Sequence, residues 1–271
     1  MIRNHQRKKY LLKSILDILV MALVTSPFIP RADASGGCNH DCSKCHRITK
    51  EEVKRIIDKN TPGGAVEVTQ VKMSPVKGIW EIVGKQGFKT GIFYLDFEKK
   101  HLIYGAIIGT RGEQNLTKAS FERNTRVSIS AINTASTLLL GNRKAATKLY
   151  VFADPTCSHC AEQHKILKRI AKERDDIAFQ IVLFPLKNIN PVSYAKAMTV
   201  YCTKSLKALE DSYEGKQVRA ASCDIKGFDE NIAVGGRYGI TGTPTIVFPN
   251  GSIYFGNLEQ KALLAILEGK K

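Results

Sequence analysis

Apolar and polar positions in the first half of the chain follow the pattern of a short helix and then short strands. Thr49-Lys50-Glu51-Glu52 has the form of a capping box, and Val53, Ile56 and Ile57 give the helix that follows one apolar face. Four runs rich in Val, Ile, Phe and Tyr come next, separated by turn residues: Ala65–Met73, Ile79–Gly84, Gly91–Asp96 and His101–Ile107. We predict a small helix-plus-meander unit, whose free sheet edge invites pairing with a second copy.

The second half of the chain mixes continuous apolar runs with helical periodicity. Two buried strands, Lys148–Asp154 and Ile177–Pro185, flank a helical segment over Cys157–Glu173. This βαβ pattern predicts parallel strands with a right-handed crossover. The later elements are expected at Ser193–Ala208 and Phe228–Tyr238 (helices), Thr245–Phe248 and Ser252–Phe255 (strands around an Asn250-Gly251 turn), and from Leu258 onward (helix).

A weaker pattern separates the two halves. Residues 111–146 are interrupted by Gly and Asn, and Ser and Thr are frequent among them. We interpret this stretch as a linker, with short helices at Lys118–Arg123 or Ile132–Leu140. The predicted domains are therefore residues 35–110, an α+β meander domain, and residues 147–271, an α/β domain.

Residues 1–34 have the features of a secretory signal peptide. Basic residues come first, an apolar stretch runs from Ile15 to Val24, and Ala32-Asp33-Ala34 resembles a cleavage site. The uninterrupted apolar run, Ile18 to Val24, is too short to span a bilayer. We expect cleavage after this segment and export of the mature chain, although an uncleaved signal anchor is the alternative.

Composition and charge narrow the function classes. The 271 residues are 43% hydrophobic and 24% charged, which is typical of globular domains and excludes wholesale disorder. The formal charge is +16, and it becomes +12 without residues 1–34, which carry six basic and two acidic side chains. The basic residues are scattered, and an exported protein meets little nucleic acid. We therefore expect no nucleic-acid partner.

The cysteines fall into two groups, and the second group carries the chemistry. Cys157-Ser-His-Cys160 lies where a buried strand turns into a helix. The free N–H groups and partial positive charge of a helix N-terminus favour Cys157 as a thiolate, and His159 can add positive charge. Cys160, one turn deeper, can attack a mixed disulfide formed at Cys157. The sequence around this pair lacks the second Cys pair of a zinc ribbon, so we expect no metal there.

At these residues the sequence resembles the thioredoxin superfamily, and more closely the DsbC/DsbG family of periplasmic protein-disulfide isomerases. The motifs that carry the resemblance are Phe-Ala-Asp-Pro-Thr-Cys157-Ser-His159-Cys160, Tyr201-Cys202, Ser222-Cys223-Asp224 and Gly-Ile-Thr-Gly-Thr243-Pro244-Thr. The resemblance covers nearly the whole mature chain. It implies a dimerising meander domain, a linker, and a thioredoxin-like domain with a helical insertion.

The resemblance also implies roles for individual residues and partners. Cys157 and Cys160 match the family's catalytic pair, Cys202 and Cys223 its structural disulfide, and Thr243-Pro244 its cis-proline loop. The implied activity is isomerisation or reduction of wrong disulfides in misfolded or mispaired exported proteins. A periplasmic homodimer, chaperone activity and re-reduction by a DsbD-like membrane protein are further implications.

The N-terminal cysteines leave a different chemistry open. Cys42-Ser-Lys-Cys45-His46 fits C-x-x-C-H, the attachment motif of c-type haem. With haem bound, Cys42 and Cys45 would form thioether bonds and His46 would be an axial ligand. The alternatives are a metal site using His40 or His46, or a disulfide among Cys42, Cys45 and the nearby Cys38 with one cysteine left over. Outside this motif the sequence implies no cofactor.

Three other functions compete with the isomerase. A DsbA-like thiol oxidase would use the same pair but keep it oxidised. A haem-bearing electron-transfer protein would depend on the N-terminal motif. A chaperone or binding module would work without Cys157.

Overall fold

A computed structural model describes residues 45–60, 66–110, 115–186, 189–219 and 221–270. The expected signal peptide, residues 1–34, lies outside these ranges. In the described part of the chain, no helix combines the length and the apolar character needed to cross a bilayer.

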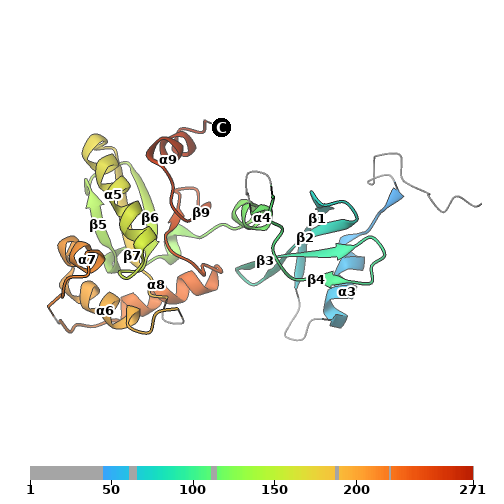
Figure 1. Cartoon of the computed structure of the whole chain (residues 1–271), viewed down its shortest axis with the longest axis horizontal. Coiled ribbons are helices and arrows are strands. Elements are labelled where there is room, and N and C mark those ends of the chain that lie inside the picture. Colours follow the sequence, from blue (N-terminus) through green and yellow to red (C-terminus); the bar gives the residue numbers. More distant parts are fainter. Residues whose placement is uncertain (1–44, 61–65, 111–114, 187–188, 220, 271) are drawn as a thin grey trace, which may run out of the picture. The chain divides into compact units, whose positions relative to one another are not determined.

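The N-terminal domain is a helix followed by a four-stranded antiparallel meander (Figure 1). Helix α3 (Lys50–Asn60) begins as the capping box predicts, because the Thr49 hydroxyl accepts a hydrogen bond from the Glu52 N–H at 3.1 Å. The strands are β1 (Glu67–Met73), β2 (Ile79–Gln86), β3 (Lys89–Asp96) and β4 (Leu102–Ile103), paired in that order. Strand β4 is much shorter than predicted, since only Leu102 and Ile103 pair with β3.

The helix covers one face of this sheet. Val53 and Ile57 pack with Trp80, Ile82 and Leu95 in a separate apolar core. Alternate residues of β2 and β3 supply that core, as the period of two in the sequence indicates.

The second domain is built on a five-stranded sheet in the order β5-β7-β6-β8-β9. Strands β6 (Thr147–Ala153) and β7 (Ile177–Leu183) are parallel, as the βαβ pattern predicts. Strands β8 (Thr245–Val247) and β9 (Ile253–Phe255) follow antiparallel. In the turn between them Gly251 has φ of +78°, and a Cβ there would lie 2.5 Å from the Val127 carbonyl oxygen.

Helices pack on both faces of this sheet, which explains why β6 and β7 are largely apolar. Leu149 and Val151 of β6 face a core shared with α5 (Ser158–Glu173), α6 (Ser193–Thr203), α7 (Leu206–Tyr213) and α9 (Gln260–Leu267). Tyr150 and Phe152 face the other core, which includes Val234 of α8 (Lys226–Arg237). The single helix predicted over Ser193–Ala208 is two helices, because Lys204 takes a left-handed conformation that ends α6.

The predicted linker, residues 111–146, was wrong at its C-terminal boundary. The helix at Lys118–Arg123 is present within α4 (Leu116–Asn124), but Ile132–Leu140 is not a helix. Instead β5 (Leu138–Gly141) pairs antiparallel with β7, and Val127 and Ile132 are buried in the second domain. Short 3-10 turns over Ile129–Ala131 and Thr134–Ser136 made the pattern look irregular. The second domain therefore begins well before residue 147.

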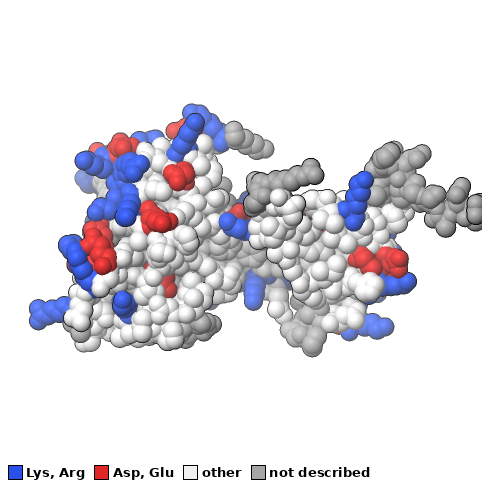
Figure 2. Space-filling model, viewed as in Figure 1, with Lys and Arg blue, Asp and Glu red and all other residues white. Residues whose placement is uncertain are grey.

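On the face drawn in Figure 2, basic and acidic side chains lie interspersed over the second domain. The charge there is a mixed, solvated surface.

Candidate active site

The Cys157–Cys160 pair lies at the junction of β6 and α5. Cys157 is the N-cap residue of α5, with extended backbone angles (φ −89°, ψ 120°) and its N–H bonded to the Asp154 carbonyl oxygen at 3.1 Å. Cys157 is partly exposed, whereas Cys160, in the first turn, is 2% exposed. Both thiols are free in this structure. One sulfur is therefore accessible to another protein and the other is shielded behind it.

The two thiols differ strongly in acidity. The pKa of Cys157 is lowered to about 5, and the largest cause is a hydrogen bond from the Cys160 thiol. The N–H groups of Cys160 and His159 and the Thr243 hydroxyl lower this pKa further. Partial burial opposes this shift. Burial, and then the Cys157 sulfur, raise the pKa of Cys160 far above the usual range of a thiol. At neutral pH the pair thus holds one accessible thiolate and one buried thiol.

The Thr243–Pro244 loop faces the pair. The peptide bond before Pro244 is cis, and the Thr243 carbonyl oxygen lies 3.5 Å from the Cys157 sulfur, from which it accepts a hydrogen bond when Cys157 is protonated. The Thr243 hydroxyl is buried and, apart from the sulfurs, has no partner among the described residues. The loop predicted from the resemblance is thus in contact with Cys157.

His159 contributes to the site through its backbone. Its side chain is 71% exposed, and its Nδ1 lies 3.4 Å from Glu162 Oε2, so its ring points to solvent and a neighbouring acid. Among the main causes of the low pKa of Cys157, His159 contributes through its backbone N–H. A contribution of its ring charge to the activation of Cys157 stays a prediction.

Asp154 is a residue of this site that sequence reasoning missed. Its carboxylate is 2% exposed and accepts hydrogen bonds from the Thr156 N–H, the Thr156 hydroxyl, the Leu186 N–H and the Ser193 hydroxyl. It therefore fixes the loop that carries Cys157 to the loop that follows β7. The available signal was a carboxylate directly after the apolar run Leu149–Ala153, three residues before the motif.

Cys202 and Cys223, which the resemblance pairs, are joined by a disulfide with Cα atoms 5.4 Å apart. The bond ties the end of α6 to the segment before α8 across 21 positions of sequence. The bond lies in the helical insertion and does not involve Cys157 or Cys160.

The N-terminal motif is only partly within the described residues. Cys42 lies outside them, as do Cys38 and His40. Cys45 is exposed with a free thiol, and the His46 ring stacks on Phe97 with ring centroids 4.3 Å apart. His46 is thus packed against the side chain that follows β3.

Both domains match models of known protein families. The family model of the thioredoxin-like domain matches residues 135–271, and that of the disulfide bond isomerase protein N-terminal domain matches residues 45–118. The thiol:disulfide interchange protein DsbC of Salmonella typhimurium is 27% identical over 205 residues, which are 73% of this chain and 81% of the relative. The DsbC protein of Escherichia coli K12 is 24% identical over 207 residues, 75% of this chain and 82% of the relative.

Solved structures that match part of the chain include a disulfide interchange protein of Neisseria gonorrhoeae. It has a TM-score of 0.45 and 22% identity, over 51% of this chain and 98% of that one. Proteus mirabilis ScsC in a compact conformation has a TM-score of 0.45 and 19% identity, over 57% of this chain and 85% of that one.

Proposed function

We propose, on the premise that this chain belongs to the DsbC family of thiol:disulfide interchange proteins, that Cys157 and Cys160 carry out its isomerase and reductase chemistry. The single observation that carries the assignment is the contrast within the pair. Cys157 has a pKa of about 5 and is accessible, whereas Cys160 is buried and protonated. That contrast suits a nucleophile and a resolving group.

The reaction begins at the accessible sulfur. The Cys157 thiolate attacks one sulfur of a mispaired substrate disulfide, forms a bond to it, and releases the other substrate sulfur as a thiolate. The Thr243 backbone, at the face of Cys157, is placed to pair with an extended substrate strand. Unfolded chains expose such strands, and they are the substrates we propose.

Two outcomes follow from the mixed disulfide. When a substrate thiolate attacks the substrate sulfur, Cys157 is released as a thiolate and the substrate has been isomerised. When the Cys160 sulfur attacks Cys157 instead, the substrate sulfur leaves reduced and the enzyme becomes oxidised. The oxidised enzyme then needs an external dithiol, and we propose a DsbD-like membrane reductant. The exchange itself uses only sulfur and needs no cofactor.

We place the enzyme in the periplasm. The predicted signal peptide supports export, and the Cys202–Cys223 disulfide suits an oxidising compartment. The match of residues 45–118 to the isomerase N-terminal domain supports a homodimer formed through the meander. Two sites in one dimer would hold a substrate through repeated exchange, which also favours chaperone activity.

Two substitutions test the roles of the pair. Cys157→Ser removes the thiolate and should abolish isomerase activity on scrambled ribonuclease. Cys160→Ser removes the resolving sulfur and should accumulate mixed disulfides with exported proteins, visible as reductant-sensitive adducts. Full isomerase activity in Cys157→Ser would refute the assignment and would favour a chaperone whose cysteines are incidental.

A further inference from the structure

A buried histidine lies one helical turn after Cys160 and has no role in the chemistry described above. His164 is 4% exposed and Cys160 is 2% exposed, and residues four apart share one face of a helix. Helical side chains lean toward the N-terminus of their helix. His164 therefore follows Cys160 by one turn on the same buried face of α5.

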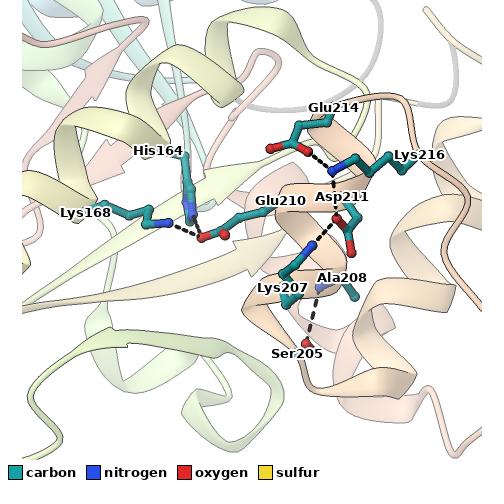
Figure 3. A network of polar contacts seen from close by, with 9 residues as sticks. All are labelled: His164, Lys168, Ser205, Lys207, Ala208, Glu210, Asp211, Glu214 and Lys216. Atoms are coloured by element: carbon teal, nitrogen blue, oxygen red, sulfur yellow. Dashed lines mark hydrogen bonds and ion pairs between the residues drawn. The ribbon is translucent and has the colours of Figure 1, made fainter.

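The ring is held from the neighbouring helix. Glu210 of α7 lies between His164 and Lys168 (Figure 3), with its Oε1 at 3.1 Å from His164 Nε2 and at 2.9 Å from Lys168 Nζ. A carboxylate on Nε2 keeps the proton of the neutral ring on that nitrogen, which leaves Nδ1 as an acceptor. Nδ1 has no hydrogen-bond partner among the described residues.

A pocket of about 170 Å³ runs along this cluster. The residues that line it are Ala161, His164, Lys165, Lys168, Glu210, Tyr213 and Glu214. The Tyr213 ring lies 5.6 Å from the His164 ring, and its phenol interacts electrostatically with both active-site sulfurs. The pocket is large enough to hold water, so a proton taken up inside the domain has a route to solvent.

Burial keeps the ring neutral at rest. Burial is the main cause that lowers the pKa of His164, Lys168 lowers it further, and Glu210 partly opposes the shift. Lys165 and Glu214 also line the pocket, and Glu214 pairs with Lys216. A neutral imidazole beside a carboxylate is a competent proton acceptor.

Cys160 needs such an acceptor. Its burial raises the pKa of its thiol, so its thiolate is scarce at neutral pH. Resolution of a mixed disulfide nevertheless requires the Cys160 sulfur as a nucleophile.

We infer that His164, oriented by Glu210, accepts the Cys160 proton in the resolving step through one water; the inference rests on the proposed function of the pair. The proton passes from Cys160 Sγ through that water to His164 Nδ1, and the electron pair left on Cys160 attacks Cys157 Sγ. The bond between Cys157 and the substrate sulfur breaks, and that sulfur leaves as a thiolate. Glu210 stabilises the imidazolium until its proton is lost to solvent.

Stopped-flow reaction with 5,5′-dithiobis(2-nitrobenzoate) separates the two sulfurs. The protein is the mature chain with Cys38, Cys42 and Cys45 changed to Ser, the active pair reduced and the Cys202–Cys223 bridge intact. Cys157 releases the first thionitrobenzoate at a rate proportional to the reagent concentration. Cys160 releases the second at a rate that does not depend on the reagent concentration. Cys160→Ser identifies the second phase by removing it.

His164→Gln should leave the first phase near its original rate and slow the second by about tenfold to a hundredfold at pH 7. Its second-phase rate should then rise steadily with pH, whereas the unaltered protein should reach a plateau once His164 is neutral. Glu210→Gln should also slow the second phase. Glu173→Gln, the same change at the exposed end of α5 and outside the pocket, is the control and should not.

The outcomes separate the two hypotheses. A second phase of unchanged rate in His164→Gln overturns the inference. Slowing of that phase by the same factor at every pH also overturns it, because a purely structural role of His164 predicts such uniform slowing. A missing first phase at pH 7 in the unaltered pair would instead contradict the proposed function. Thermal unfolding of each variant shows whether it is folded during the measurement.

Discussion

Replacing Cys160 by Ala should raise the pKa of Cys157 by about one to two units. The hydrogen bond from the Cys160 thiol is the largest cause of the low value, about 5, at Cys157. A hydrogen bond to a charged group contributes about 1.5–3 kcal/mol, and one pKa unit corresponds to about 1.4 kcal/mol. Loss of this bond should therefore move the pKa of Cys157 to about 6–7. The N–H groups of α5 and the Thr243 hydroxyl remain and hold it below the ordinary value of about 8.5.

The ultraviolet absorbance of the thiolate against pH measures this shift. The protein should carry Ser at Cys38, Cys42 and Cys45, so that Cys157 dominates the titration. Cys160→Ser is the matched control, since its hydroxyl keeps a donor at the same place and should give a smaller shift than Ala. A Cys157 pKa that stays at about 5 in Cys160→Ala would refute the reasoning. It would assign the activation to the helix N-terminus instead.

Three further predictions concern assembly, the structural disulfide and pH. Deleting residues 35–110 should give a protein that sediments as a monomer, keeps dithiol reductase activity and loses most isomerase activity. A full-length protein that is monomeric at micromolar concentration would contradict this. Changing Cys202 and Cys223 together to Ala should lower the free energy of unfolding by about 3 kcal/mol, because the bridge closes a loop of 21 positions. Reductase activity should persist in this variant. Peptide mapping that finds Cys202 bonded to Cys157 would overturn the pairing. The reduced protein should gain stability relative to Cys157→Ser as pH rises from about 5 to about 8.5, because Cys157 ionises at a lower pH in the folded chain than in the unfolded one. It should lose that gain as pH falls through about 5. A difference in unfolding free energy that stays flat across this range would show that Cys157 is not ionised early.

The sequence predicts most of the fold, because the strands and helices of both domains have strong periodic patterns. The continuous apolar run of β6 and the amphipathic α5 define the βαβ unit and place Cys157 at the helix N-terminus. Strand β5 was missed because a four-residue edge strand, Leu138–Gly141, has no period long enough to distinguish it from a helix. Its pairing with β7 is a contact between distant residues, which local patterns do not record.

The supporting residues of the site were harder to predict than the cysteines. The spacing of Cys157 and Cys160 is itself a signal, whereas the burial of Asp154 and His164 depends on partners 32 to 46 positions away. A motif also records neighbours in sequence and not the direction of a side chain, and the His159 ring lies exposed beside Glu162. Polar residues on otherwise apolar faces were the one available sign of Asp154 and His164.

The redox state of the pair in its own compartment tests the central claim most directly. Acid quenching of intact cells, alkylation of free thiols and mass analysis of the peptides give the oxidised fraction of each cysteine, with Cys202 and Cys223 as the internal standard of an oxidised pair. An isomerase kept active by a membrane reductant should have Cys157 and Cys160 mostly as free thiols while Cys202 and Cys223 are bonded. A Cys157–Cys160 pair found mostly as a disulfide would contradict the account and would identify a thiol oxidase.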